Sequence, residues 1–209
     1  TRITGVGIWR RPLGYFNRAP WVGKLLYNGN YVLDGTVNNP LAHLLNNCLL
    51  LSGLKNYEDS SPKWVQSELY RSNAVESEDA SCIRIKTEGG IEVYFFASIC
   101  GYTNETPYIK VQCTKGEAIW HYDGNMEFRD LTGNLVLSDK IASNPHKDHY
   151  ENVLDYISGA SEKAPCPIEF TRSFVLASNL AFESSKLTHK IEGSHIEFWD
   201  VNGQPISEL

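Results

Sequence analysis

The sequence lacks the features that mark membrane and secreted proteins. Its 209 residues hold no apolar run that approaches the roughly 20 residues needed to span a bilayer, and its first residues do not resemble a signal peptide. We therefore expect a soluble protein in the cytoplasm.

Charge of one sign is not concentrated anywhere in the chain. The 19 basic and 25 acidic residues leave a net charge of -6, and neither sign forms a long run. This pattern excludes the basic patch of a nucleic-acid-binding protein and a surface that binds anionic membranes. A small molecule or another protein is the expected partner.

Paired cysteines and metal-binding clusters are missing as well. The 5 cysteines are odd in number and widely spaced, no two form a Cys-x-x-Cys motif, and most lie in apolar segments where a free thiol packs as a small hydrophobe. His146 and His149 come closest to metal-ligand spacing, but the solvated start of a helix explains this pair as well. We expect a reducing compartment and no metal site.

The sequence does contain ample material for one domain over residues 1–209, since 42% of the residues are apolar and 11% are aromatic. Alternating apolar residues predict strands, and apolar residues at helical spacing predict helices. The expected strands are 1–9, 64–72, 80–87, 91–100, 108–113, 117–122, 126–129, 135–137, 187–191 and 196–199; the expected helices are 39–53, 144–159 and 168–185, and a turn is expected at 201–205.

This order of elements predicts an α+β fold, with a large mixed, mostly antiparallel open sheet and helices on one face. In the strand from Ile91 to Cys100, apolar residues occupy positions on both faces. A sheet that is apolar on both sides needs cover on both, so we expect the second face to be available for homo-oligomerisation.

One segment has the composition of a site rather than of a scaffold. Asp34, Asn38 and Asn39 precede the first helix, and Asn39, which a proline follows, is expected to be its N-cap. His43 lies about 200° around the helix axis from the core residue Leu41, on the polar side of the helix. A carboxylate, two amides and an imidazole thus surround the start of one helix.

Three stretches carry a resemblance to a known family. They are Asn17-Arg18-x-x-Trp21-x-Gly23-Lys24-Leu25, Val32-Leu33-Asp34-Gly35-x-Val37-Asn38-Asn39-x-Leu41-Ala42-His43 and Glu68-x-x-Arg71-x-Asn73-x-x-Glu76-Ser77-Glu78-Asp79. With them the chain resembles, over nearly all of its length, the C-terminal domain of the Gfo/Idh/MocA family of NAD(P)-dependent oxidoreductases. The resemblance implies a sheet domain that forms the substrate side of the cleft and the oligomer interface, with a first strand that directly follows a nucleotide-binding domain.

The chain departs from this family in what it offers a cofactor. No Gly-x-Gly-x-x-Gly follows a strand, because Gly5-Val6-Gly7 lacks the third glycine and the following helix, and Gly89-Gly90 indicates a hairpin turn. The family's Glu-Lys-Pro lysine is also absent, since Glu162-Lys163-Ala164 is expected in a loop. We expect NAD or NADP to be bound in the intact protein and by no residue of this chain.

A second departure concerns acid and base. Many relatives carry Asp-x-Gly-x-His-x-x-Asp, where this chain has Asp34, then Asn38 in the place of the histidine and Leu41 in the place of the second aspartate. An amide does not exchange a proton near neutral pH, so proton transfer would move to His43 or Asp34. These two are the expected catalytic residues, and Asn38 is expected to orient a hydroxyl.

Each of these expectations has a plain alternative. Asp34 could form an Asx-type turn with Gly35, and the His43 imidazole could be hydrogen-bonded to Asn39 or Asn47. The residues then serve the loop and the helix rather than a ligand.

Further candidate substrate-binding residues are Asn39, Arg18, Trp21, Lys24 and Arg71. In the long segment from Arg10 to Asn30, an aromatic ring could stack on a sugar while a basic group holds hydroxyls or a carboxylate, although such aromatic residues also serve as packing residues. Arg71 belongs to an acidic stretch before a strand, which is either a substrate-side loop or a solvated surface turn.

The resemblance implies that the intact protein passes a hydride between a nicotinamide and the hydroxyl carbon of a sugar, sugar acid or cyclitol. This chain is then its substrate-binding and oligomerisation domain, with a polyhydroxylated small molecule as ligand, and is inactive on its own. The alternative is a non-enzymatic module that binds sugar or forms oligomers.

Overall fold

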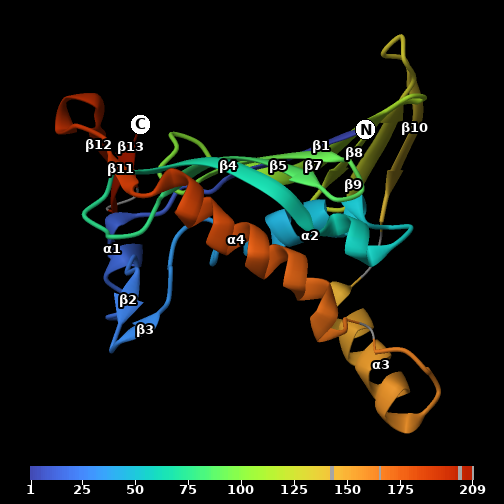
Figure 1. The fold of residues 1–209 in the computed structure, drawn as a ribbon. Coiled ribbons are helices and arrows are strands. Elements are labelled where there is room, and N and C mark those ends of the chain that lie inside the picture. The colour runs from blue at the N-terminus through green and yellow to red at the C-terminus, as the bar shows by residue number, and fades with distance from the viewer. Residues whose placement is uncertain (142–143, 165, 202–203, 209) are drawn as a thin grey trace.

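A sheet of nine strands dominates the computed structural model, which describes residues 1–141, 144–164, 166–201 and 204–208 (Figure 1). From edge to edge the strands are β10 (Leu135–Lys140), β9 (Asn125–Arg129), β8 (Gly116–His121), β7 (Glu105–Cys113), β1 (Arg2–Ile8), β6 (Glu92–Ser98), β5 (Ala80–Thr87), β4 (Pro62–Arg71) and β11 (Thr188–Lys190). Neighbours are antiparallel except that β1 runs parallel to β6, and β11 to β4. The predicted α+β fold with a mixed, mostly antiparallel sheet is confirmed.

The other elements do not belong to this sheet. They are the helices α1 (Leu13–Phe16), α2 (Ala42–Ser52), α3 (Pro145–Ser158) and α4 (Arg172–Ser185), the 3-10 turns η1 (Tyr57–Ser60), η2 (Ile168–Thr171) and η3 (Gly193–His195), and the two hairpins of β2 (Leu26–Tyr27) with β3 (Asn30–Tyr31) and of β12 (Glu197–Val201) with β13 (Gln204–Glu208). The helix expected at 168–185 is divided into η2 and α4, and residues 202–203 of the expected turn lie outside the described residues. In the part of the chain that the structure describes, no helix combines the length and the apolarity that crossing a bilayer requires.

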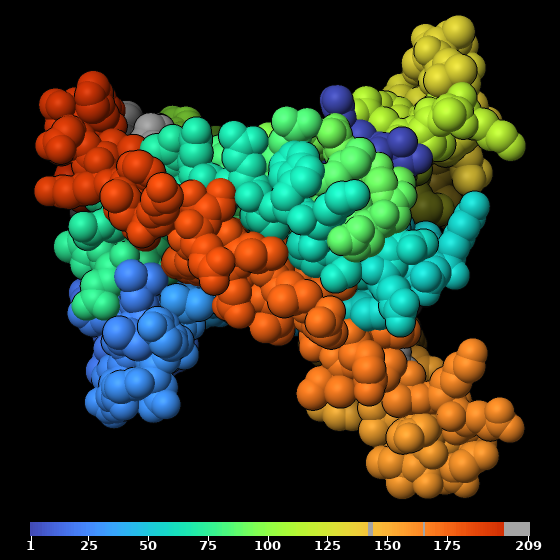
Figure 2. Space-filling model, in the orientation of Figure 1, coloured from blue at the N-terminus to red at the C-terminus, as the bar shows by residue number. Residues whose placement is uncertain are grey.

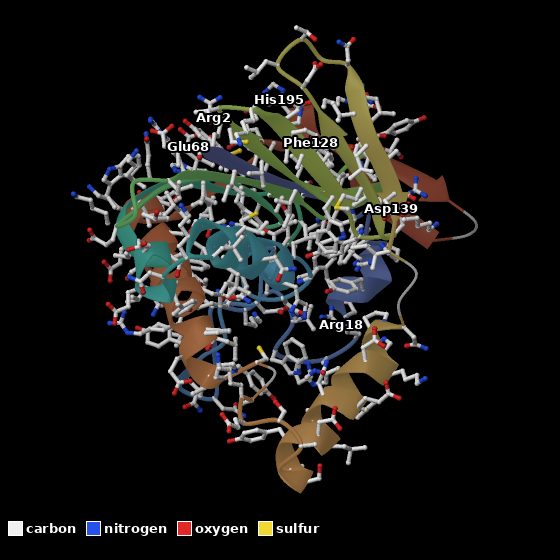
Figure 3. All side chains as sticks on the ribbon, turned by 90° about the vertical axis from the view of Figure 1, so that its right-hand side faces the viewer. Arg2, Arg18, Glu68, Phe128, Asp139 and His195 are labelled. Carbon is white, nitrogen blue, oxygen red and sulfur yellow. The ribbon has the colours of Figure 1, made fainter. Side chains whose placement is uncertain are left out.

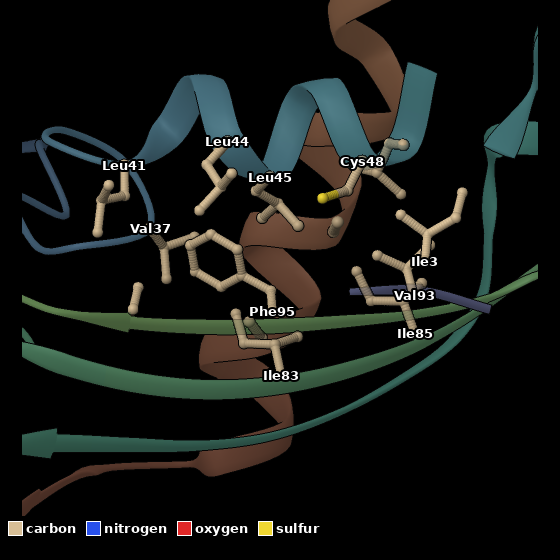
Figure 4. Close-up of a cluster of buried hydrophobic side chains, with 14 of the residues drawn as sticks. Ile3, Val37, Leu41, Leu44, Leu45, Cys48, Ile83, Ile85, Val93 and Phe95 are labelled. Atoms are coloured by element: carbon tan, nitrogen blue, oxygen red, sulfur yellow. The ribbon is translucent and has the colours of Figure 1, made fainter. Parts of the chain in front are cut away.

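Helices α2 and α4 cover one face of the sheet and form the core with it (Figures 1 and 4). Leu45 and Cys48 of α2 are fully buried together with Phe95 of β6. Glycine on β1 lets the helix approach closely, because a Cβ on Gly7 would lie 2.6 Å from Cδ2 of Leu41. The glycines of β1 therefore serve helix packing.

The first turn of α2 differs from the prediction. The helix begins at Ala42, its N-cap residue is Leu41, and no side chain caps it. Asn39 instead donates from Nδ2 to Oδ1 of Asp34, 2.6 Å away. This charge-assisted hydrogen bond holds the Asn39 side chain against Asp34, and residues 39–41 form a turn before the helix.

The opposite face of the sheet carries no helix in the described part of the chain, and Arg2 and Glu68 project from it (Figure 3). Its centre is aromatic, because the rings of Tyr94 and Phe96 stack with centroids 6.5 Å apart. The guanidinium of Arg84 lies over Tyr94 and pairs with a carboxylate on the same face. We refer to this surface as the open face.

Two arms extend from the helix-covered side, one formed by the segment 10–40 and the other by α3 (Figure 2). Helix α3 forms where it is predicted, because the side chain of Asn144 accepts a hydrogen bond from the backbone N–H of Lys147 and Gly159 ends the helix at φ 78°. None of its residues is buried. Its predicted apolar stripe, which includes Tyr150 and Leu154, therefore faces solvent.

Candidate functional site

Asp34 holds two parts of the N-terminal arm together. It is only 8% exposed, and its Oδ2 accepts a hydrogen bond from the backbone N–H of Gly23 at 2.7 Å, while Oδ1 accepts the bond from Asn39. Gly23 has φ 67°, a conformation that glycine adopts without strain. Both carboxylate oxygens thus fix the geometry of the loop that carries the predicted site.

The same loop rests on a second carboxylate, that of Glu78, which is 1% exposed. Oε1 accepts from the backbone N–H of Val37 at 3.0 Å and from the hydroxyl of Thr36 at 3.4 Å, and Ser77 contacts Oε2 at 2.6 Å. Burial raises the pKa of Glu78 to about 7, against the effect of these hydrogen bonds. The interpretation of this stretch as a solvated surface turn is therefore wrong for Glu78.

Asp79, the next residue, braces the turn that leads into β5. Its Oδ2 accepts hydrogen bonds from the backbone N–H of Asn73 at 2.8 Å and from that residue's Nδ2 at 2.9 Å. Arg71, a predicted substrate residue, donates from Nη1 to the backbone carbonyl of Val75 within the same turn. These contacts stabilise the turn 71–79.

Lys24, another predicted substrate residue, joins this turn to the N-terminal arm. Its Nζ lies 2.7 Å from Oε1 of Glu76, and the backbone N–H of Glu76 donates to the carbonyl of Gly23 at 2.7 Å. Both side chains are about half exposed, so water weakens the ion pair. The backbone hydrogen bond is what fixes the two segments.

The remaining predicted residues of the loop point in different directions. Oδ1 of Asn38 accepts a hydrogen bond of 2.7 Å from the hydroxyl of Ser178 on α4, and its Nδ2 is buried without a partner in the described structure. His43 is exposed in the first turn of α2, and no hydrogen bond or ion pair to it is present among the described residues. Neither Asn39 nor Asn47 holds this imidazole in the described structure.

Arg18 lies on the helix-covered side of the sheet (Figure 3) and contacts two aromatic rings. The Arg18 guanidinium is centred 3.6 Å from the ring centroid of Tyr15 and 5.3 Å from that of Trp21. Its Nη1 donates to the backbone carbonyl of Tyr15 at 2.8 Å. Arg18 and Trp21 therefore belong to one stacked group.

Of the predicted site residues, Asp34 and Asn39 are thus in direct contact through a hydrogen bond. The backbone N–H of Asp34 also donates to the carbonyl of Lys24 at 2.9 Å, which brings Lys24 next to these two residues. Arg71 braces a different turn. Sequence reasoning missed the buried role of Glu78, although two adjacent acids directly before an apolar strand were a signal for it.

The most apolar pocket described lies elsewhere. It has a volume of about 490 Å³ and lies between the end of α2 and strands β7 to β9. Leu50, Trp120 and Met126 are among its lining residues, and none of the predicted site residues is. The polar loop, not this pocket, is the candidate site.

The described residues contain no group of three or more His, Cys, Asp or Glu side chains that could hold a metal ion, and each of the five cysteines is a free thiol. A phosphate cradle is also not found on β1. A Cβ on Gly5 would lie 2.7 Å from Sγ of Cys48, so this glycine packs against α2 and its backbone does not face a ligand. Gly5 therefore serves helix packing rather than a phosphate cradle.

No model of a protein family matches the sequence, and no curated protein does. Solved structures share the fold. The WlbA dehydrogenase from Bordetella pertussis, in complex with NADH and UDP-GlcNAcA, has 18% identity and a TM-score of 0.63 over 88% of this chain and 53% of its own. The UDP-N-acetylglucosamine 3-dehydrogenase GnnA from Acidithiobacillus ferrooxidans has 11% identity and a TM-score of 0.66 over 88% and 53%.

An oxidoreductase from Agrobacterium radiobacter, in complex with NAD+, L-tartaric acid and magnesium, has 14% identity and a TM-score of 0.59 over 88% of this chain and 54% of its own. The chain therefore spans about half the length of the structures it matches. The chain shares the fold of about half of each of these oxidoreductase structures, as its resemblance to the Gfo/Idh/MocA C-terminal domain implies.

Proposed function

We propose that this chain is the substrate-binding and oligomerisation domain of an NAD(P)-dependent oxidoreductase that acts on a hydroxyl of a sugar, sugar acid or cyclitol. The observation that carries the proposal is the shared fold with about half of the WlbA, GnnA and Agrobacterium structures, two of which contain NADH or NAD+. The braced polar loop of residues 34–43 supports it, because a polyhydroxylated ligand needs fixed donors and acceptors.

In this proposal the residues of the loop have distinct roles. His43 transfers the proton of the reacting hydroxyl, since its side chain is exposed and an imidazole can both accept and donate a proton. Asn38, whose Nδ2 is without a partner in the described structure, orients the hydroxyl. Asp34 acts on catalysis through the loop, because both of its oxygens already accept hydrogen bonds.

The nicotinamide cofactor belongs to another domain of the intact protein, and a cytoplasmic location accords with this chemistry. Titration of NADH into the 209-residue chain is expected to show no saturable binding. Tight binding of NADH would refute the assignment of the cofactor to another domain.

Binding of polyhydroxylated probes tests the substrate role directly. Saturation-transfer NMR with D-glucose, D-glucuronate and myo-inositol is expected to detect at least one of the three, and Asn38→Ala is expected to weaken the signal. Arg129→Gln is the matched control, because Arg129 pairs with Glu127 far from the loop. If none of the probes binds, or if Asn38→Ala binds as the unchanged chain does, the substrate role fails.

The open face favours a second function, homo-oligomerisation. Phe96 is 40% exposed at the centre of the sheet and stacks on Tyr94, and exposed aromatic residues in a mixed polar surface are typical of interfaces. Light scattering after size exclusion is expected to report an oligomer that Phe96→Glu dissociates. A monomeric unchanged chain would exclude this role, and a domain that oligomerises but binds no sugar would favour a non-enzymatic module.

A further inference from the structure

Five side chains between residues 9 and 21 stack alternately as aromatic ring and guanidinium, from Trp9 through Arg11, Tyr15 and Arg18 to Trp21. The Arg11 guanidinium is centred 5.2 Å from the ring of Trp9 and 5.1 Å from that of Tyr15. Arg18 continues the stack between Tyr15 and Trp21 at 3.6 Å and 5.3 Å. We call these five residues the stacked strip.

The two charges of the strip have no acidic partner in the part of the chain that the structure describes. No carboxylate lies within 4.0 Å of Arg11 or Arg18, and Nε of Arg11 is buried with no hydrogen bond. Arg84 and Arg129, by contrast, are paired: Arg84 lies 2.9 Å from Glu92 and Arg129 lies 2.7 Å from Glu127.

Stacking fixes these guanidinium groups without using their hydrogen-bonding capacity. An arginine side chain carries five N–H donors in its plane, and aromatic rings occupy only the faces of that plane. In the described structure, Arg18 donates one bond, to the carbonyl of Tyr15. The in-plane donors of Arg11 and Arg18 are thus held ready for an acceptor.

The strip leads from a pocket to the candidate loop. Trp9 and Arg11 line a pocket of about 600 Å³ together with the carboxylates Glu105 and Asp123 and with Tyr122, whose hydroxyl is buried without a partner among the described residues. At its other end, Trp21 is two residues from the glycine that Asp34 holds. Donors, acceptors and aromatic surface therefore lie along one path.

We propose that the stacked strip binds the oxyanion group of a polyhydroxylated ligand, with Arg11 and Arg18 donating to a carboxylate or a phosphate. This inference rests on the proposed function and narrows the substrate to an anionic sugar. Guanidinium groups match the geometry of both oxyanions, and the Glu105 carboxylate can accept hydrogen bonds from the hydroxyls of the same ligand. An uncharged sugar such as D-glucose lacks the oxyanion group that the two arginines would bind.

Calorimetric titration of the full chain with D-glucuronate, D-glucose 6-phosphate and D-glucose tests this assignment. The preferred anionic sugar is expected to bind at least about tenfold more tightly than D-glucose, the factor that one charge-assisted hydrogen bond supplies. Tighter binding of glucuronate identifies a carboxylate as the group, and tighter binding of the phosphate ester identifies a phosphate. Arg11→Gln and Arg18→Gln are each expected to reduce the affinity to that of D-glucose.

Arg84→Gln is the matched control, because Arg84 is also stacked on Trp64 and Tyr94 but lies on the open face and is paired with Glu92. The Arg84→Gln variant should bind the three sugars with the same affinities as the unchanged chain. Arg18 is exposed, so its variant is expected to fold even if the Arg11 variant does not. Equal affinities for all three sugars, with loss of binding in Asn38→Ala, would overturn the anion site and leave the substrate role intact. Binding of none of the sugars would overturn both.

Discussion

Gly35 and Glu78 lie in direct contact, so that a Cβ on Gly35 would stand 2.2 Å from the carboxylate of Glu78. The glycine is needed for space, since its φ is not in the left-handed region. This approach lets the next two residues of the loop reach the carboxylate with their own N–H and hydroxyl groups.

Gly35→Ala is therefore expected to lower the free energy of unfolding by about 1–3 kcal/mol, the usual cost of forcing atoms into a packed site. Gly14→Ala is the matched control, because a Cβ there meets nothing within 4 Å. Urea denaturation measures both. A Gly35 variant as stable as the Gly14 variant would contradict the close approach.

Stability is expected to depend on pH through Glu78. Burial raises its pKa from 4.5 to about 7, so the folded state favours the neutral acid. This contribution is full below the unfolded pKa of about 4.5 and is lost as pH rises through about 7. The loss amounts to about 3 kcal/mol, at about 1.4 kcal/mol for each pKa unit.

Glu78→Gln keeps the shape and removes the titration. Urea denaturation at about pH 5 and about pH 8.5 is expected to show a fall for the unchanged chain that is largely missing in the variant. A variant with the same fall would assign the pH dependence to other groups.

A Leu→Ala substitution is expected to lower the free energy of unfolding far more in the core than on the α3 arm. Leu45 on α2 is 0% exposed, whereas Leu154 on α3 is 63% exposed. Leu45→Ala is expected to cost about 2–5 kcal/mol and Leu154→Ala less than about 0.5 kcal/mol, because only the first leaves a cavity. Similar losses in thermal or urea unfolding would show that α3 is covered in solution.

His43→Ala is expected to separate folding from chemistry. The side chain is exposed, so the free energy of unfolding should change by less than about 0.5 kcal/mol. In the intact oxidoreductase, loss of a general acid or base should lower kcat about 10²–10⁴-fold with little change in substrate affinity. His121→Ala, on β8, serves as the control. Full turnover by the His43 variant would remove this residue from the mechanism.

The docking of the loop on α4 is expected to depend on one hydrogen bond. Ser178→Ala removes the donor to Oδ1 of Asn38 and should cost about 1 kcal/mol, because a partly buried acceptor loses its hydrogen bond. A double-mutant cycle with Asn38→Ala measures the coupling. Additive effects of the two substitutions would show that the bond does not stabilise the loop.

Many of the strands could be predicted from the sequence, because a strand depends on the local alternation of apolar and polar residues. In β6, Val93, Phe95 and Ala97 are buried and Tyr94 and Phe96 lie on the open face, as the period of two predicts. The arrangement of strands was not accessible in this way. Nothing near residues 2–8 indicates that β1 inserts between β6 and β7.

The site was predicted less well, because its side chains are held by distant partners. Asn39 has the local signal of a helix cap, but the helix begins three residues later, at Ala42, and Nδ2 of Asn39 donates to Asp34. The burial of Glu78 depends on Val37, 41 positions earlier in the chain. Such pairings arise only once the loop and the strand are packed together, so residue type and spacing do not disclose them.

The position of β1 in the sheet has a consequence for how the protein is made. Arg2 pairs with Glu92 on β6 and with Gln112 on β7, so about 90 residues must be synthesised after Arg2 before the central strand can meet its first neighbour. Contacts between such distant segments slow folding, because a long loop must close before they form. Until then the nascent chain exposes the apolar side of β1, and we expect it to be a substrate for chaperones during translation.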